Sequence, residues 1–150
     1  MRSLYTLEEA FVIPVFRFRC PKCRKTFSIL PHFVEPHHQS AVDVKEAVVR
    51  SGEEGRSLTV LASDSASFAG GPYAEKTLWR WQRCWKRRLN RHEEQIWRTI
   101  LHCGLEVPLP SERRSSWKAL WAGWFFLSRP DRLFHELLRL DRLSSMAATG

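Results

Sequence analysis

The sequence predicts a mainly α-helical protein that begins with a small β segment. Three observations support this fold class. After residue 40, apolar side chains recur every three or four residues through most of the chain, which is the spacing of amphipathic helices. The first 39 residues instead carry short runs of strand-forming residues around turn residues. Hydrophobic residues make up 43% of the 150 residues, enough to bury a core.

The predicted β segment occupies residues 1–39. Apolar residues between 12 and 18 predict a strand that runs into a turn at residues 20–23, with the sequence Cys-Pro-Lys-Cys. Residues 26–30 predict the strand that returns from this turn. Two prolines then break regular structure, so we expect residues 30–38 to form an extended connector.

Residues 40–91 form a second segment, which we predict to hold three helices. Ser40 is the predicted N-cap of a first helix that ends near Arg50, and Ser57 starts a short second helix. The third helix covers residues 74–91. The loop before it is about ten residues long and rich in Ser and Gly. The order of the helices is helix-turn-helix-like, although the usual turn has three or four residues.

Residues 92–150 form the third segment, for which the sequence predicts helices but no role. We expect one helix over residues 93–103, a second over residues 116–127 and a third that begins near Pro130. Prolines at 108 and 110 predict a linker between the first two of these helices.

Positive charge is concentrated in one part of the chain. The net charge is +8 and the isoelectric point is about 9.9, which favours a polyanionic partner. Residues 74–91 hold seven basic side chains against one acidic side chain, whereas the other 132 residues hold 17 basic and 15 acidic side chains. The predicted third helix therefore carries most of the excess charge.

The predicted third helix has two opposite faces. At 3.6 residues per turn its Leu and Trp side chains form one stripe, which predicts a buried face. The basic side chains fall on the other side, where they could neutralise phosphates, and Arg can also bind guanine edges. The alternative is an ordinary solvated basic face. The candidate nucleic-acid-binding residues are Lys76, Thr77, Arg80, Arg83, Arg87 and Arg91.

Cys20 and Cys23 have the spacing of half a structural zinc site, because two thiolates in a Cys-x-x-Cys turn can bind one tetrahedral Zn²⁺ ion. They are candidate metal ligands of an incomplete site. His32, His37 and His38 are candidates for the missing ligands. Other interpretations are a knuckle without its other half, a redox pair and a site shared between two chains. A redox enzyme is disfavoured, because the motif lacks a β-α-β context.

The sequence predicts a protein that is not an enzyme. A nuclease core needs clustered carboxylates to hold two divalent metal ions, and the four aspartates are scattered along the chain. There is no Gly-rich phosphate loop and no Gly-x-Ser-x-Gly motif. No stretch has the length of a membrane span and no secretory signal is recognisable, so we expect a cytoplasmic protein without a membrane partner. The aspartates are Asp43, Asp64, Asp131 and Asp141.

Three motifs follow one another within residues 17–91. They are Cys20-x-x-Cys23 with Thr26-Phe27, then Leu30-Pro31-x-Phe33-x-x-Pro36, then Tyr73-x-x-x-Thr77-Leu78-x-Arg80-Trp81. In this combination the chain resembles a bacterial family of uncharacterised, transposase-like proteins. The resemblance implies a partial zinc-ribbon-like segment over residues 1–39 and a helix-turn-helix-like DNA-binding region over residues 40–91. The chain departs from the family pattern because no cysteine precedes Cys20 and Arg24 stands where glycine is common.

Together these features predict binding to double-stranded DNA, sequence-specific or non-specific, by a mobile-element-associated protein without its own catalytic core. The rival prediction is a protein–protein interaction or homo-oligomerisation module, in which helices around Trp117, Trp121 and Trp124 pack against a partner. RNA binding is a third, weaker alternative, because a basic helix alone does not distinguish the two nucleic acids. DNA affinity should fall steeply with salt, whereas oligomers built on tryptophan should not respond to it.

Overall fold

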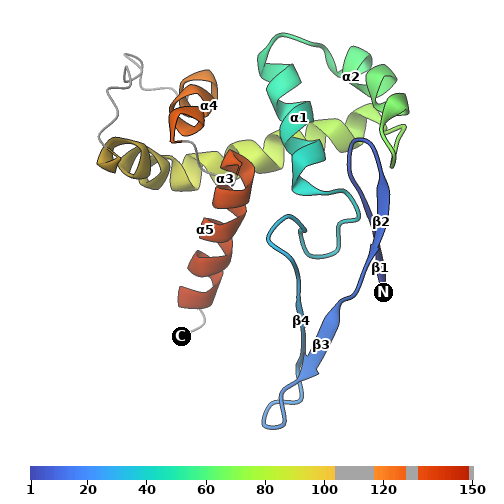
Figure 1. Ribbon diagram of the computed structural model, residues 1–150, viewed down its shortest axis with the longest axis vertical. Coiled ribbons are helices and arrows are strands. Elements are labelled where there is room, and N and C mark those ends of the chain that lie inside the picture. The colour runs from blue at the N-terminus through green and yellow to red at the C-terminus, as the bar shows by residue number, and fades with distance from the viewer. Residues whose placement is uncertain (104–116, 128–131, 149–150) are drawn as a thin grey trace.

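The computed structural model describes residues 1–103, 117–127 and 132–148 of the chain (Figure 1). These residues form five α-helices and two small antiparallel sheets, which confirms the mainly α fold class. The predicted linker prolines 108 and 110, the helix start near Pro130 and the carboxylate of Asp131 lie outside the described residues.

Two β-hairpins form the N-terminal part of the protein. β1 (Arg2–Tyr5) pairs with β2 (Ala10–Ile13), and β3 (Phe16–Arg19) pairs with β4 (Thr26–Ile29). The prediction of one strand from residue 12 to the cysteine turn was wrong, because Pro14 lies between β2 and β3 and has no backbone N–H for a ladder. The β3–β4 hairpin projects away from the helices (Figure 1).

The first two helices lie close to their predicted positions. α1 (Val42–Glu53) begins after Ala41, and no side chain caps it. Ser40, the predicted N-cap, instead forms a hydrogen bond of 3.0 Å between its hydroxyl and that of Tyr73. α2 (Leu58–Asp64) begins one residue after its predicted start at Ser57, and Ser57 caps it: the Ser57 Oγ accepts a hydrogen bond of 3.3 Å from the backbone N–H of Val60.

The loop between α2 and the next α-helix is compact. It includes the short 3₁₀ helix η1 (Ser65–Ser67). The Oγ of Ser65 donates to the carbonyl of Ala62 at 2.7 Å and accepts from the N–H of Tyr73 at 2.8 Å, which ties the two ends of the loop together. Gly71 passes so close to Ser65 that a Cβ atom at Gly71 would lie 1.8 Å from the Ser65 carbonyl oxygen. Only glycine fits there without a shift of the backbone.

α3 (Glu75–His102) is a single helix of 28 residues, about 42 Å long at 1.5 Å per residue. The sequence predicted two helices here, with a boundary near residue 91, and that division was wrong. No glycine or proline occurs between Glu75 and His102, so nothing in the chain ends the helix earlier. α3 runs across the molecule and contacts helices from both sides of its position in the sequence (Figure 1).

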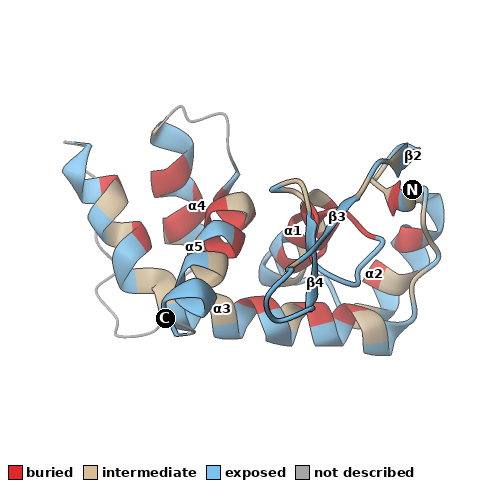
Figure 2. Ribbon diagram, turned by 90° about the horizontal axis from the view of Figure 1, so that it is seen from below, coloured by how far each residue is buried: buried red, intermediate tan, exposed pale blue. Residues whose placement is uncertain are grey.

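The core lies where α1, α4 (Trp117–Phe126) and α5 (Leu133–Ala147) pack against one side of α3 (Figure 2). The ring of Trp85 stacks on Phe134, with 4.1 Å between the ring centroids and 16° between the planes. Other residues in this cluster include Leu78, Leu89, Ile96, Ile100, Trp117, Leu120, Trp121, Leu133 and Leu137. Among the described residues, no helix packs against the opposite side of α3, which is exposed (Figure 2).

Candidate nucleic-acid interface

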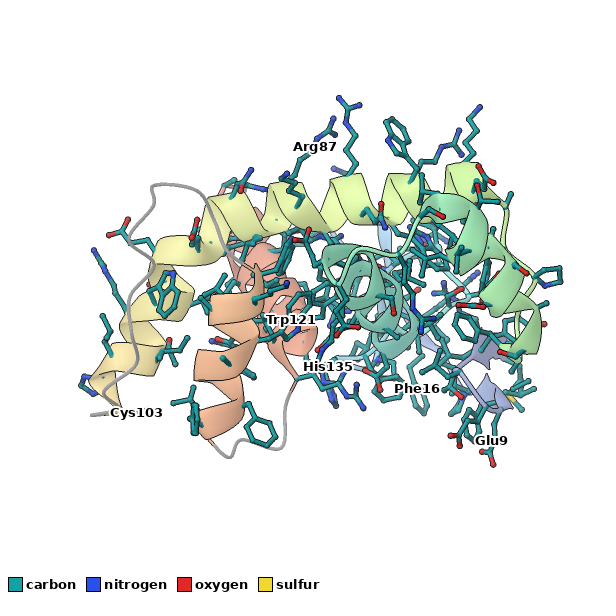
Figure 3. The ribbon with its side chains drawn as sticks, turned by 90° about the horizontal axis from the view of Figure 1, so that it is seen from above. Glu9, Phe16, Arg87, Cys103, Trp121 and His135 are labelled. Atoms are coloured by element: carbon teal, nitrogen blue, oxygen red, sulfur yellow. The ribbon has the colours of Figure 1, made fainter. Side chains whose placement is uncertain are left out.

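Most basic side chains in the first half of α3 line its outer face, on the side away from α1 and α4, as Arg87 shows in Figure 3. Five of the predicted residues are exposed and follow one another at steps of three or four residues. From first to last the row rises about 22 Å along the helix. These residues, which we call the α3 stripe, are Lys76, Arg80, Arg83, Arg87 and Arg91.

Most of the α3 stripe is free of acidic neighbours. Within the described parts of the chain, only Arg91 among the five forms an ion pair, at 3.4 Å from Oδ1 of Asp141, and its side chain is still 61% exposed. The exposed Trp79 flanks the stripe, and the guanidinium of Arg83 lies 5.1 Å from the centroid of its ring. The stripe therefore offers cations, with one aromatic ring, to an external anion.

Thr77 differs from the other predicted residues. It is half-buried on the side of α3 nearer to α1, where it lines a cavity together with Arg80, Tyr73, Trp81 and Lys45. Thr77 therefore lies at the edge of the α3 stripe and not within it.

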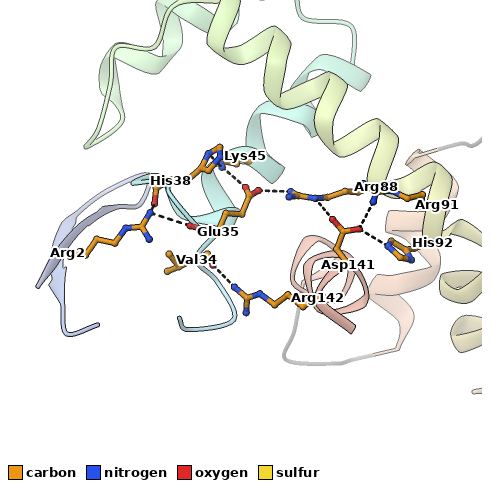
Figure 4. A network of polar contacts seen from close by, with 10 residues as sticks. All are labelled: Arg2, Val34, Glu35, His38, Lys45, Arg88, Arg91, His92, Asp141 and Arg142. Carbon is orange, nitrogen blue, oxygen red and sulfur yellow. Dashed lines mark hydrogen bonds and ion pairs between the residues drawn. The ribbon is translucent and has the colours of Figure 1, made fainter. Parts of the chain in front are cut away.

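The inner side of α3 holds a cation of a different kind. The Nε of Arg88 donates to Oδ2 of Asp141 at 2.9 Å, and its Nη1 lies 2.7 Å from Oε2 of Glu35 without hydrogen-bond geometry. Glu35 also pairs with Lys45, whose Nζ lies 2.8 Å from Nδ1 of His38 (Figure 4). These residues, which we call the Arg88 network, join the segment before α1 to α1, α3 and α5. Arg88 is therefore a structural residue, although the sequence counted it with the basic excess.

The Arg88 network sets the charge state of its two carboxyl groups. Burial would raise the pKa of Glu35, but the nearby cations Lys45 and Arg88 more than offset this, so the pKa lies below its ordinary value. Burial likewise opposes ionisation of Asp141, while hydrogen bonds from His92 and Arg88 lower the pKa of that carboxyl overall. Both groups are therefore held ionised in the folded protein.

Cys20 and Cys23 lie together at the tip of the β3–β4 hairpin. The N–H of Cys20 donates to the carbonyl of Lys25 at 2.9 Å, and the N–H of Arg24 donates to the carbonyl of Cys20 at 2.9 Å. Hydrogen bonds from the backbone N–H and thiol of Cys23, and from the N–H of Lys22, lower the pKa of the Cys20 thiol. Arg24 has a φ of 57°, in the left-handed region where glycine is favoured. Both cysteines therefore lie in one tight turn at the end of the hairpin.

The structure does not bring the candidate histidine ligands to this turn. The ring of His32 makes edge contacts with Phe33 and His135, at centroid distances of 5.3 and 5.0 Å. His38 contacts Lys45, and His37 lies in an exposed turn. Among the residues that the structure describes, no group of three or more His, Cys, Asp or Glu side chains could hold a metal ion.

A second basic region, on the β3–β4 hairpin, was missed by the sequence analysis. Residues 10–34 contain five basic side chains and no acidic one, and all five are exposed. Counting charge over the remaining 132 residues as one group concealed this run, whereas a search for acid-free stretches would have found it. The five hairpin cations are Arg17, Arg19, Lys22, Arg24 and Lys25.

None of the helices in the described ranges is long and apolar enough to cross a membrane.

The comparisons with known proteins identify one family. No curated protein and no solved structure matches the chain. A family model described as Domain of unknown function (DUF6431) matches residues 2–81, which include both hairpins, α1, α2 and the start of α3. The match takes in Lys76 and Arg80 and ends before Arg83. Since it spans more than half of the sequence, the chain belongs to the DUF6431 family.

Proposed function

We propose that this protein binds double-stranded DNA through the α3 stripe. The observation that carries the proposal is a row of five exposed cations on one helix face, four of them without a carboxylate partner in the described structure. If all five contacted phosphates, the logarithm of the binding constant would fall against the logarithm of salt concentration with a slope of about −4.5.

The arrangement of the first three helices supports a helix-turn-helix-like docking. α1, α2 and α3 contact one another, and α3 exposes its outer face over its whole basic length. The long loop before α3 is tied by Ser65 and Gly71, so it can position α3 as a shorter turn would. In this proposal α3 lies against the duplex, with Arg side chains able to reach base edges as well as phosphates.

The cysteine turn supports an accessory zinc-ribbon-like role for the N-terminal segment. Cys20 and Cys23 would hold a Zn²⁺ ion. Its remaining ligands would have to be other than His32, His37 and His38, because no described group of three or more His, Cys, Asp or Glu side chains could hold a metal ion. We also propose that the protein is associated with a mobile element. This part of the proposal rests on the resemblance of the three sequence motifs to transposase-like proteins. Zinc content of the purified protein, compared with that of a Cys20→Ser plus Cys23→Ser variant, tests the metal.

The carboxylates support a binding protein without a catalytic core. Asp43 pairs with His135, Asp64 with Arg56 and Asp141 with Arg88. Each of these described aspartates is thus committed to a basic partner, and they lie on separate elements. They do not form the acidic cluster that a two-metal nuclease needs.

The rival interaction module finds less support. Trp117, Trp121 and Trp124 are 3%, 9% and 5% exposed, because they pack within this chain. Their rings therefore have little surface left for a partner. RNA binding, the third alternative, is tested by adding unlabelled RNA as a competitor in the binding experiment below.

The proposal is tested by titrating the protein into a labelled DNA duplex at several salt concentrations. Arg80→Ala plus Arg83→Ala should weaken binding and reduce the salt slope by about 1.8, which is two phosphate contacts. The matched control is Arg50→Ala plus Arg98→Ala, since both arginines are exposed but already paired with Glu54 and Glu94. Equal losses in the two double variants would show that net charge alone drives binding, and would refute a specific role for the stripe.

A further inference from the structure

The β3–β4 hairpin has an apolar face that nothing in the described structure covers. Phe16 lies opposite Ile29 and Phe18 opposite Phe27 in the ladder, so the four side chains point to the same side. Their exposures are 65%, 57%, 46% and 55% in that order. In most half-buried hairpins such a face covers a core, whereas here it faces solvent.

The aromatic residues on this face are already arranged as a platform. The rings of Phe18 and Phe27 are nearly parallel, with 20° between their planes and 5.6 Å between their centroids. This offset leaves ring surface open to a further flat group. A planar ligand could therefore continue the stack without rearranging the hairpin.

Cations lie beside and behind the platform. Lys22, Arg24 and Lys25 occupy the tip of the hairpin, whereas Arg17 and Arg19 alternate with Phe16 and Phe18 on β3 and therefore point to the opposite face of the sheet. No acidic side chain lies between residues 10 and 34. An occupant of this hairpin must therefore present flat apolar groups and a dense row of negative charge together.

We propose that the β3–β4 hairpin binds single-stranded nucleic acid, with unpaired bases stacked on Phe18 and Phe27 and phosphates neutralised by the cations at its tip, Lys22, Arg24 and Lys25. In a duplex the faces of the bases are covered by their neighbours, so this platform selects an unpaired strand. The site is separate from the α3 stripe and does not depend on the function proposed for it.

Two other occupants fit the hairpin less well. A second copy of the chain would bring two sets of five cations together, which is repulsive. An anionic bilayer would attract the cations, but the tip that would enter it first carries Lys22, Arg24 and Lys25, which are costly to place in hydrocarbon. Single-stranded nucleic acid satisfies both the rings and the charges.

The test measures fluorescence anisotropy of a labelled oligothymidine strand of about 20 nucleotides, long enough for one binding site. Phe18→Ala plus Phe27→Ala should weaken binding about tenfold or more and leave duplex binding unchanged. Phe125→Ala plus Phe126→Ala is the matched control, because these rings are 80% and 63% exposed on α4 and also contact each other. Lys22→Ala plus Lys25→Ala at the tip should reduce the salt slope for the single strand by about 1.4.

Each result supports or overturns the proposal. An oligouridine strand in parallel shows whether RNA or DNA is preferred, and hairpin-dependent binding of either supports the site. Wild-type affinity of the Phe18→Ala plus Phe27→Ala variant for both strands would overturn it. The proposal would also be overturned if sedimentation velocity showed that the wild-type protein is a dimer and that this variant is a monomer. Hairpin-dependent binding to phosphatidylserine vesicles, without binding to either strand, would overturn it as well. Loss of duplex binding in the Arg80→Ala plus Arg83→Ala variant, with strand binding intact, would show that the two sites are independent.

Discussion

The two sides of α3 use the same residue type in opposite ways. Arg88 points inward, is 13% exposed and contacts Glu35 and Asp141. Arg87, the preceding residue, points outward and has no carboxylate partner among the described residues. A single step of 100° along the helix separates a cation that holds the fold together from one that is free to bind.

The outer side has an energetic cost that the inner side does not. Like charges three or four residues apart on a helix destabilise it by about 0.2–0.5 kcal/mol per pair, and the α3 stripe has four such steps. The stripe therefore costs on the order of 1 kcal/mol without gaining an ion pair, apart from that of Arg91. Packing within the described structure gives no reason for this arrangement, whereas the DNA binding proposed above would.

The largest expected effect separates the two sides by their tryptophans. Trp85→Ala should destabilise the protein by about 3–5 kcal/mol, because Trp85 is 1% exposed and stacks on Phe134. Trp79→Ala on the outer side should cost less than about 1 kcal/mol, since Trp79 is 44% exposed. Urea denaturation of both variants measures the difference, and similar losses would mean that α3 is buried on both sides.

The next effect separates the two sides by their arginines. Arg88→Ala should lower the free energy of unfolding by about 3 kcal/mol, because it leaves the buried carboxylate of Glu35 with only Lys45 as a cation. Chemical denaturation measures this loss against Arg87→Ala, which removes the same side chain one position away. A small loss for Arg88→Ala would show that water or Lys45 alone satisfies Glu35.

Acid should act on the inner side. The pKa values of Glu35, Asp43 and Asp141 lie below their ordinary values, and burial together with Lys45 lowers that of His38. The unfolded chain therefore binds more protons, so stability is complete above the ordinary histidine and carboxyl pKa values and falls as pH drops through them. Burial raises the pKa of Glu46, which partly opposes this trend.

Denaturation curves recorded from about pH 7 to about pH 3 measure this acid dependence. Asp141→Asn should reduce the slope of stability against pH, because it removes one of the groups whose pKa is lowered. Glu94→Gln is the control, since that carboxylate is 79% exposed and, within the described structure, its one ion pair is with Arg98. A slope unchanged in the Asp141 variant would place the acid-sensitive groups elsewhere.

The smallest expected change is a gain in stability. Arg87→Gln removes like-charge neighbours at Arg83 and Arg91 and should stabilise the protein by a few tenths of a kcal/mol. The same variant should reduce the salt slope of duplex binding by about 0.9. Thermal unfolding and the duplex titration measure the two effects. A gain in stability together with a loss of duplex affinity in this variant would support the outer side as a binding surface. A loss of both stability and affinity would contradict that interpretation.

The residues on the outer side of α3 could be predicted from helical periodicity. The contacts of Arg88 on the inner side could not, because its partners are far away in the sequence. Because a helix repeats every 3.6 residues, the α3 stripe and the buried Trp85 could be placed from spacing alone. Asp141 lies 53 residues from Arg88, and Glu35 sits in a connector that the sequence marks only with prolines, so no local pattern links the three. The continuity of α3 was missed because residues 90–95 are polar, although they contain no helix breaker.

The hairpins show the same limit. The turn at Cys20 and the returning strand β4 were predictable from turn and strand-forming residues. β1 was not, because its four residues include only one that is buried, Leu4. The exposed aromatic platform could not be read from the sequence either, since alternating apolar residues predict a covered face.

The closeness of Gly71 to Ser65 has a consequence for tolerance to mutation. Every side chain larger than hydrogen at Gly71 collides with backbone, which cannot rotate away as a side chain can. In a scan of all single substitutions, we expect this loop position to be as intolerant as the buried tryptophans. Backbone geometry alone would explain such sensitivity, so by itself it would not identify a ligand site.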